Sequence, residues 1–240
     1  MYHLKKLTID THPTPLEINN EIINNPLRPH TIICNEYSLT PAKIKKLLGN
    51  NCNVCIHQTD NFSKPKLQEL ITTGKARVIL HPKDFSEDDM FSYLEKEASA
   101  IFSKEDGFDL FQIKMMAKKG KKRVTVLAKD LPELDVIEYI NEGANILIKK
   151  EDGFNPFAIK RLAKAGGSLV NIHANGHPDF WLKKFLNEKA IVTIGEGNNF
   201  FPNFIKQYVL KYNSQIHISA NKFNDKTWLS EMENEGAVIV

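Results

Sequence analysis

The stretch EDGFDLFQIKMMAKKG, from Glu105 to Gly120, is written a second time as EDGFNPFAIKRLAKAG, from Glu151 to Gly166. Ten of the sixteen positions are identical at an offset of 46 residues, and the composition of the stretch is too varied for a low-complexity match. A duplication at a fixed offset is the signature of a chain built from similar stacked units. Such units bury their apolar faces against one another, because none of them is large enough to do so alone.

The same period runs through most of the chain as a column of large, mostly apolar residues. Consecutive members of this column are 23 residues apart: Leu39, Phe62, Phe85, Phe108, Leu131, Phe154, His177, Phe200 and Phe223. Apolar residues two positions apart precede each member, which is the pattern of a strand with one buried face. These pairs are Ile32/Cys34, Val54/Ile56, Val78/Leu80, Ala100/Phe102, Val124/Val126, Ile146/Ile148, Val170/Ile172, Val192/Ile194, Ile216/Ile218 and Val238/Val240. Their first members are 22 and 24 residues apart in alternation, which produces the offset of 46.

A short helix is predicted after each column residue. Residues that favour the N-cap position stand at Ser63, Ser86, Asp109, Asn155 and Asn224, and helix-ending glycines stand at Gly120, Gly143, Gly166 and Gly236. Each unit therefore consists of a strand, a turn, a helix and a turn. Neighbouring strands lie about 4.8 Å apart whereas packed helices need about 8 to 10 Å, so helices on one side of a sheet would bend it into an arc.

Two stretches carry a resemblance to a known family. VNIHANGH, from Val170 to His177, and IHISANKF, from Ile216 to Phe223, match the pattern LxLxxNxL, and VTVLAKDL and VILHPKDF match it apart from a lysine at the asparagine position. The chain thus resembles the leucine-rich repeats. The resemblance implies a right-handed βα solenoid, a horseshoe with its parallel sheet on the concave face and its short helices on the convex face. It covers residues 31–240 as about nine to ten units of 22–24 residues in a single domain, with residues 1–30 as an N-terminal cap.

The expected function follows from the concave face. Strand residues between the buried pairs would line it, and the face would be apolar in its N-terminal half, which is typical of a contact surface. We therefore expect a non-enzymatic scaffold that binds a protein partner, as a secreted bacterial effector or an adaptor. The residues predicted to bind the partner are Ile33, Cys55, His57, Ile79, His81, Ile101, Thr125, Leu147, Asn171, His173 and His217.

An enzyme remains open as the alternative. In a closed parallel βα barrel, His57, His81 and Ser103 would lie on neighbouring strands and form a hydrolase-like site. However, no acidic residue in this row orients an imidazole, and the barrel would have ten strands where such barrels have eight.

Composition excludes several other classes of function. The net charge of the 240-residue chain is +3, and the arginines favoured by nucleic-acid readers are scarce, at Arg28, Arg77, Arg123 and Arg161. We expect no nucleic-acid partner, no membrane partner and a cytoplasmic location, because the chain has neither an apolar run of about 20 residues nor a secretory signal pattern.

Free thiols are expected at the three cysteines, Cys34, Cys52 and Cys55. An odd number argues against a disulfide framework, and the CxxC pair of Cys52 and Cys55 has no second pair to complete a metal site. No cofactor is expected. The last strand, from Ala237 to Val240, would leave an open edge through which the chain can self-associate.

Overall fold

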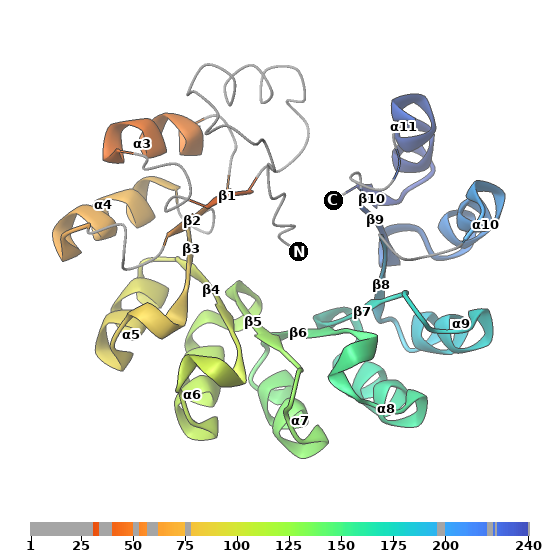
Figure 1. Ribbon diagram of the computed structural model, residues 1–240, viewed down its shortest axis with the longest axis horizontal. Coiled ribbons are helices and arrows are strands. Elements are labelled where there is room, and N and C mark those ends of the chain that lie inside the picture. The colour runs from red at the N-terminus through yellow and green to blue at the C-terminus, as the bar shows by residue number, and fades with distance from the viewer. Residues whose placement is uncertain are drawn as a thin grey trace. The chain divides into compact units, whose positions relative to one another are not determined.

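The computed structural model describes residues 31–33, 40–49, 53–56, 62–74, 78–195, 200–219, 223 and 225–239 (Figure 1). The chain divides into two compact units, Met1–Thr125 and Val126–Val240. The N-terminal cap predicted for residues 1–30 lies outside the described residues, and so does His57.

Strands and helices alternate along the first unit. Its strands are β1 (Thr31–Ile33), β2 (Asn53–Ile56), β3 (Val78–Leu80) and β4 (Ser99–Phe102), and β5 (Val124–Leu127) follows at the boundary of the unit. Its helices are α3 (Pro41–Gly49), α4 (Lys64–Gly74), α5 (Glu87–Glu95) and α6 (Leu110–Gly120), with 3-10 turns η3 (Pro82–Asp84), η4 (Lys104–Asp106) and η5 (Lys121–Arg123). Strands β1 to β4 pair in sequence order and in parallel, and the helices of this unit lie on one side of them (Figure 1).

The second unit has the same alternation. Its strands are β6 (Asn145–Ile148), β7 (Val170–His173), β8 (Ile191–Ile194), β9 (Ile216–Ile218) and β10 (Val238–Ile239), again parallel and in sequence order. Its helices are α7 (Glu133–Asn141), α8 (Pro156–Gly166), α9 (Asp179–Asn187), α10 (Pro202–Tyr212) and α11 (Lys226–Asn234), with 3-10 turns η6 (Lys150–Asp152), η7 (Gly167–Leu169) and η8 (Asn213–Gln215). Among the described residues, no helix is long and apolar enough to cross a membrane.

The predicted helix starts are largely confirmed. The side chains of Ser86, Asp109 and Asn155 each accept a hydrogen bond from the backbone N–H three residues later, at 3.3, 2.8 and 2.9 Å. Such bonds satisfy N–H groups that have no partner inside the helix. Helix α11 is capped by Asp225, whereas the predicted cap, Asn224, lies outside the described residues.

The duplicated stretch encodes one turn twice. Asp106 and Asp152 each accept a hydrogen bond from the backbone N–H three residues earlier, at 2.6 and 2.7 Å. The next residues, Gly107 and Gly153, have φ values of +83° and +81°, a left-handed conformation that glycine adopts without steric cost. The sequence EDG therefore turns the chain from the end of a strand toward the following helix in both copies.

The glycine that ends each copy has a packing role. A Cβ atom added at Gly120 would lie 2.6 Å from Cγ2 of Val124, and one added at Gly166 would lie 2.7 Å from Cγ2 of Val170. Real Cβ atoms do not approach other carbons so closely. The last turns of α6 and α8 can therefore lie directly against the strands that follow them because these positions carry no side chain.

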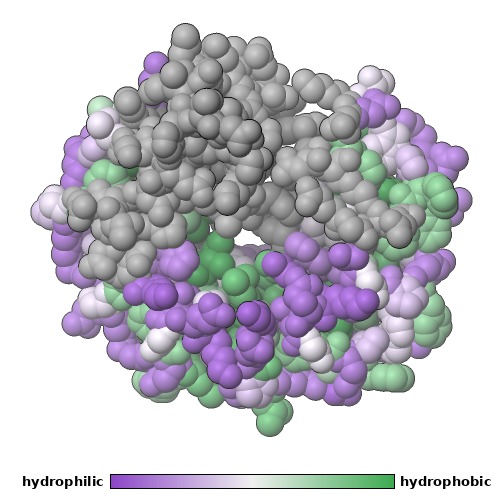
Figure 2. All heavy atoms as spheres, in the orientation of Figure 1, coloured by the Kyte–Doolittle hydropathy of each residue, from purple (hydrophilic) through white to green (hydrophobic). Residues whose placement is uncertain are grey.

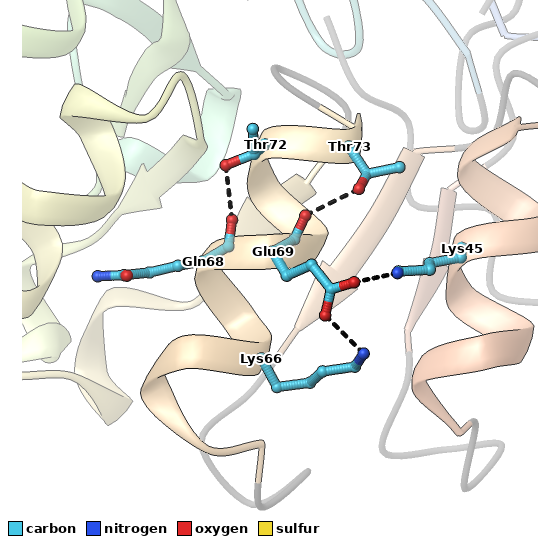
Figure 3. Close-up of polar contacts among 6 residues, drawn as sticks. All are labelled: Lys45, Lys66, Gln68, Glu69, Thr72 and Thr73. Atoms are coloured by element: carbon cyan, nitrogen blue, oxygen red, sulfur yellow. Dashed lines mark hydrogen bonds and ion pairs between the residues drawn. The ribbon is translucent and has the colours of Figure 1, made fainter.

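Side chains also join neighbouring helices. Figure 3 shows Glu69 of α4 bound both by Lys45 of α3 and by Lys66 of its own helix, the latter at 2.6 Å. These hydrogen bonds, that of Lys45 first, lower the pKa of Glu69 to about 2. On the same helix, the hydroxyls of Thr72 and Thr73 donate to the carbonyl oxygens of Gln68 and Glu69, each at 2.8 Å.

Burial of the strands contradicts the predicted concave surface. The strand face toward the helices is apolar and buried, as expected, but most of the opposite face is buried too. Cys55 and Ile79 are 5% and 1% exposed, and Asn171 and His217 are 4% and 6% exposed. Ile101, Thr125 and Leu147 are half-buried. Parallel strands covered on both faces are typical of α/β proteins, whereas an open leucine-rich-repeat horseshoe leaves one face to solvent.

The register of the strands is a second departure from the leucine-rich repeat. In a solenoid, equivalent residues of neighbouring units lie opposite each other. Here Ile79 lies opposite Ser99 instead of Ile101, and Asn171 lies opposite Ile191 instead of Thr193. Strands that slip by two residues in this way show the stagger that barrels require. The leucine-rich-repeat-like solenoid is therefore wrong, and the fold is an α/β fold of staggered parallel strands.

Candidate functional site

Buried polar side chains gather on one face of the second unit. Asn171, Thr193, His217 and Ser219 are between 2% and 8% exposed and belong to β7, β8 and β9 or follow them directly. They lie on the strand face opposite the helices, where the first unit has Cys55 and Ile79. A buried polar group costs free energy unless it is hydrogen-bonded, so such a group of residues indicates a role other than packing.

The strand register brings two histidines next to one threonine. Thr193 of β8 lies opposite His173 of β7 on one side and opposite His217 of β9 on the other. The Thr193 hydroxyl donates a hydrogen bond to Oδ1 of Asn171 at 2.9 Å. This bond restricts the rotamer of Thr193.

The surroundings of His173 favour its neutral form. It stands at the carboxyl end of β7, one residue beyond the paired Ile148 and Ile172, and it is half-buried. Burial lowers the pKa of His173, and the positive charge of nearby Lys149 lowers it further, while Glu151 opposes this to a smaller degree. A neutral imidazole has a free lone pair and accepts a proton at neutral pH.

Lys149 is positioned by the turn that follows β6. Its backbone N–H donates to Asp152 at 2.7 Å, and its ammonium lies 4.0 Å from the carboxylate of Glu151. Burial raises the pKa of Asp152, and the negative charges of Glu151 and Asp130 act in the same direction. The Lys149 side chain remains 43% exposed, so its charge is accessible from solvent.

Gly195 and Ser219 lie close together at the ends of neighbouring strands. Gly195 follows β8, and a Cβ atom added there would lie 3.3 Å from Cβ of Ser219. Ser219 follows β9, and its backbone N–H donates to the carbonyl of Ile194 at 2.8 Å. Since the carboxyl ends of parallel strands share one edge of a sheet, Lys149, His173, Gly195 and Ser219 meet at the place where α/β proteins bind their ligands.

His177 serves packing in the same unit. It occupies a position of the aromatic column and is 8% exposed, with its ring edge-on to Phe185 at a centroid distance of 5.7 Å. Burial lowers the pKa of His177, and Lys150 lowers it further. Its Nε2 has no hydrogen-bond partner within the described part of the chain.

The structure separates the predicted site residues into two groups. Asn171, His173 and His217 come together with Thr193. By contrast, the slip between β3 and β4 prevents His81 and Ser103 from lying opposite each other. Their predicted neighbour His57, like the side chain of Ile33, falls outside what the structure describes.

Thr193, Lys149 and Ser219 lie in or directly after strands of the second unit, but they were not among the residues predicted for the site. The available signal was the change from apolar to polar residues after Leu147. Within the described residues, no group of three or more histidine, cysteine, aspartate or glutamate side chains is arranged to hold a metal ion.

No protein-family model matches the chain, and no curated protein does. Several solved structures match at low similarity. One is an arginine decarboxylase from Paramecium bursaria Chlorella virus, with 13% identity, a TM-score of 0.37, and coverage of 82% of this chain and 59% of the decarboxylase. A protein assigned as a fructose-1,6-biphosphate aldolase from Coccidioides immitis has 13% identity, a TM-score of 0.37 and coverage of 90% and 88%. Tryptophan synthase from M. tuberculosis has 11% identity, a TM-score of 0.36 and the same coverage of 90% and 88%.

These three structures are named as enzymes.

Proposed function

We propose that this chain is an enzyme that binds a small anionic molecule at the carboxyl ends of β6 to β9 and transfers a proton with His173. The observation that carries the proposal is the position of half-buried His173 at the carboxyl end of β7, next to the end of β6 where Lys149 stands. Burial, and then the positive charge of Lys149, lowers the pKa of His173. An imidazole with a lowered pKa is a general base at neutral pH, and a lysine at the rim of the same site attracts an anion.

The remaining groups have consistent roles. Gly195 and Ser219 lie side by side at the ends of β8 and β9, because a Cβ atom added at Gly195 would lie 3.3 Å from Cβ of Ser219. Thr193 lies opposite His173 and is itself held by Asn171. Side chains whose rotamers are locked by buried hydrogen bonds position a reacting group more precisely than side chains on mobile loops do.

Of the two functions expected from the sequence, the enzyme fits this arrangement better than the protein-binding scaffold. A scaffold would need the residues of the inner face to be exposed, and Cys55, Ile79, Asn171 and His217 are buried. The enzyme proposed here uses other residues than the hydrolase-like trio, because His81 and Ser103 are out of register.

Binding of an anion and protonation of His173 should be coupled. Burial and then the charge of Lys149 lower the pKa of His173, and a bound anion near Lys149 would offset the second effect and raise that pKa. By linkage, the affinity for the anion increases as the pH falls toward that pKa.

The test combines NMR titration of His173 with ligand-induced thermal stabilisation. Inorganic phosphate and succinate serve as the simplest phosphoryl and carboxylate probes. We expect His173 to titrate below 6.5, the ordinary histidine pKa, and one of the probes to raise both this pKa and the Tm in a saturable manner.

Two variants sharpen the test. Lys149→Gln should abolish the response to the probe and raise the pKa of His173, because the neighbouring positive charge is gone. Lys160→Gln is the matched control, since Lys160 is a surface lysine of α8 that lies 3.7 Å from Glu188. If neither probe binds, or if Lys149→Gln responds as the wild type does, the proposed site is wrong.

A further inference from the structure

Four large apolar side chains stand exposed at the beginnings of successive helices in the second unit. They are Leu134 of α7, Phe157 of α8, Phe180 of α9 and Phe201, which directly precedes α10, and they are 75%, 65%, 59% and 79% exposed. We call these four residues the apolar stripe. Figure 2 shows hydrophobic residues over α7 to α10 among hydrophilic neighbours.

The helices do not need these residues for their own packing. Helix α8, for example, already buries Ile159 and Leu162 against its unit. Large apolar side chains that are exposed in addition to a complete core are costly in water. Contiguous apolar patches of this kind mark interaction sites.

Trp181 connects two members of the stripe. Its ring is edge-on to Phe157 at 4.9 Å and to Phe180 at 5.6 Å, so side chains from α8 and α9 form one continuous aromatic surface. The ammonium of Lys184 lies 4.2 Å from the ring centroid of Phe180 and 5.1 Å from that of Trp181. The aromatic side chains are thus held in place before any partner binds, which reduces the entropy lost on association.

The exposed area agrees with that of a protein interface. With about 150–250 Å² of surface for each phenylalanine, the three exposed fractions amount to about 400 Å², and Leu134 brings the stripe to about 500 Å². A standard interface buries about 800 Å² on each partner, of which about 60% is apolar, which is also about 500 Å².

The charges around the stripe favour an identical surface as the partner. Glu133 is bound by Arg161 through two hydrogen bonds of 2.7 Å, and Asp179 is bound by Lys183 at 2.7 Å. These two pairs neutralise their own charges, and Lys184 is a charge beside the stripe that lies over the Phe180 and Trp181 rings. An anionic membrane, in contrast, is attracted by an excess of unpaired basic residues.

We propose that the apolar stripe is the contact surface between two copies of this chain, related by a two-fold axis. A surface of this kind is self-complementary because each copy presents the same patch to the other. The inference is independent of the proposed enzymatic function, since it rests on the first turns of the helices and not on the strand ends.

Sedimentation velocity of the full chain over a dilution series from about 1 to about 100 µM tests this proposal. We expect a dimer whose dissociation constant rises at least about tenfold in the double variant Phe157→Glu/Phe180→Glu. Leu210→Glu is the matched control, because Leu210 is 55% exposed near the end of α10 and lies outside the stripe. This control should dimerise as the wild type does.

Far-UV circular dichroism verifies that the variants are folded. If the double variant unfolds, Phe201→Glu decides, since Phe201 is 79% exposed. A wild-type chain that stays monomeric throughout the series overturns the proposal, and so does a dimer that Phe201→Glu and the double variant leave intact. Co-sedimentation of a monomeric wild type with phosphatidylserine vesicles would assign the stripe to a membrane instead.

Discussion

Replacing Thr193 by valine tests whether the polar group in the second unit is held together by the bond that the structure shows. Valine has the shape of threonine but no hydroxyl, so the substitution removes the hydrogen bond to Asn171 without changing the packed volume. Thr193 is 2% exposed and Asn171 is 4% exposed, so water does not replace the lost donor easily. The bond is 2.9 Å long, the length of a normal hydrogen bond.

The magnitude follows from the asymmetry of hydrogen-bond energetics. Leaving a buried acceptor without this donor costs about 1–2 kcal/mol. For a chain of 150–250 residues, such a loss lowers the Tm by roughly 2–8 °C. Replacing both partners, in Asn171→Leu/Thr193→Val, removes the orphaned group as well. The double variant should therefore be more stable than the sum of the two single losses predicts.

Urea unfolding followed by tryptophan fluorescence is the appropriate assay. The two tryptophans of the chain, Trp181 and Trp228, both belong to the unit that contains Thr193. The free energy of unfolding of Thr193→Val should fall by about 1–2 kcal/mol at an unchanged m value. A Thr193→Val variant as stable as the wild type, or strict additivity in the double variant, would refute the reasoning.

Two further predictions concern packing and surface charge. Gly166→Ala should lower the free energy of unfolding by about 1–3 kcal/mol, because the new Cβ would lie 2.7 Å from the Val170 side chain, whereas Gly49→Ala, with nothing within 4 Å, should be close to neutral. Equal urea midpoints for the two alanine variants would contradict this account. Lys45→Met should raise the pKa of Glu69 from about 2 toward 4.5, as measured by NMR, because its strongest hydrogen bond is lost. Since that pKa is lowered on folding, the wild type gains stability from Glu69 above pH 4.5 and loses it as the pH falls toward 2. A Lys45→Met variant whose stability depends on pH as that of the wild type does would show that the ion pair does not form in solution.

Local features of the fold were predictable from the amino-acid sequence. Strands and helices lie where the alternating pairs, the cap residues and the helix-ending glycines indicated, and the caps at Asp109 and Asn155 are present. These features depend on residues within one turn of each other. The turn beginning at Asp106 and its copy at Asp152 belong to the same class, because each is closed by a bond to a residue three positions away.

The leucine-rich-repeat interpretation failed because it required information about distant contacts. A period of two residues shows which strand residues share a face, but it does not show whether that face is covered. The apolar residues Cys55 and Ile79 on the face opposite the helices predict an exposed contact surface in a solenoid, but they are buried, as is typical of strands covered on both sides. Likewise, the slip that sets Ile79 opposite Ser99 leaves no trace in the spacing of the units.

The candidate site shows the same division. The amino-acid sequence alone determines that Asn171, Thr193 and His217 share one strand face, because alternation along a strand is a local property. Only the tertiary structure decides that this face is buried and that burial, together with Lys149, lowers the pKa of His173, since burial and electrostatic fields depend on segments far apart in the chain. A polar residue in a strand produces the same sequence pattern whether its side chain faces solvent or a functional site. Only the packing around it in the tertiary structure distinguishes the two.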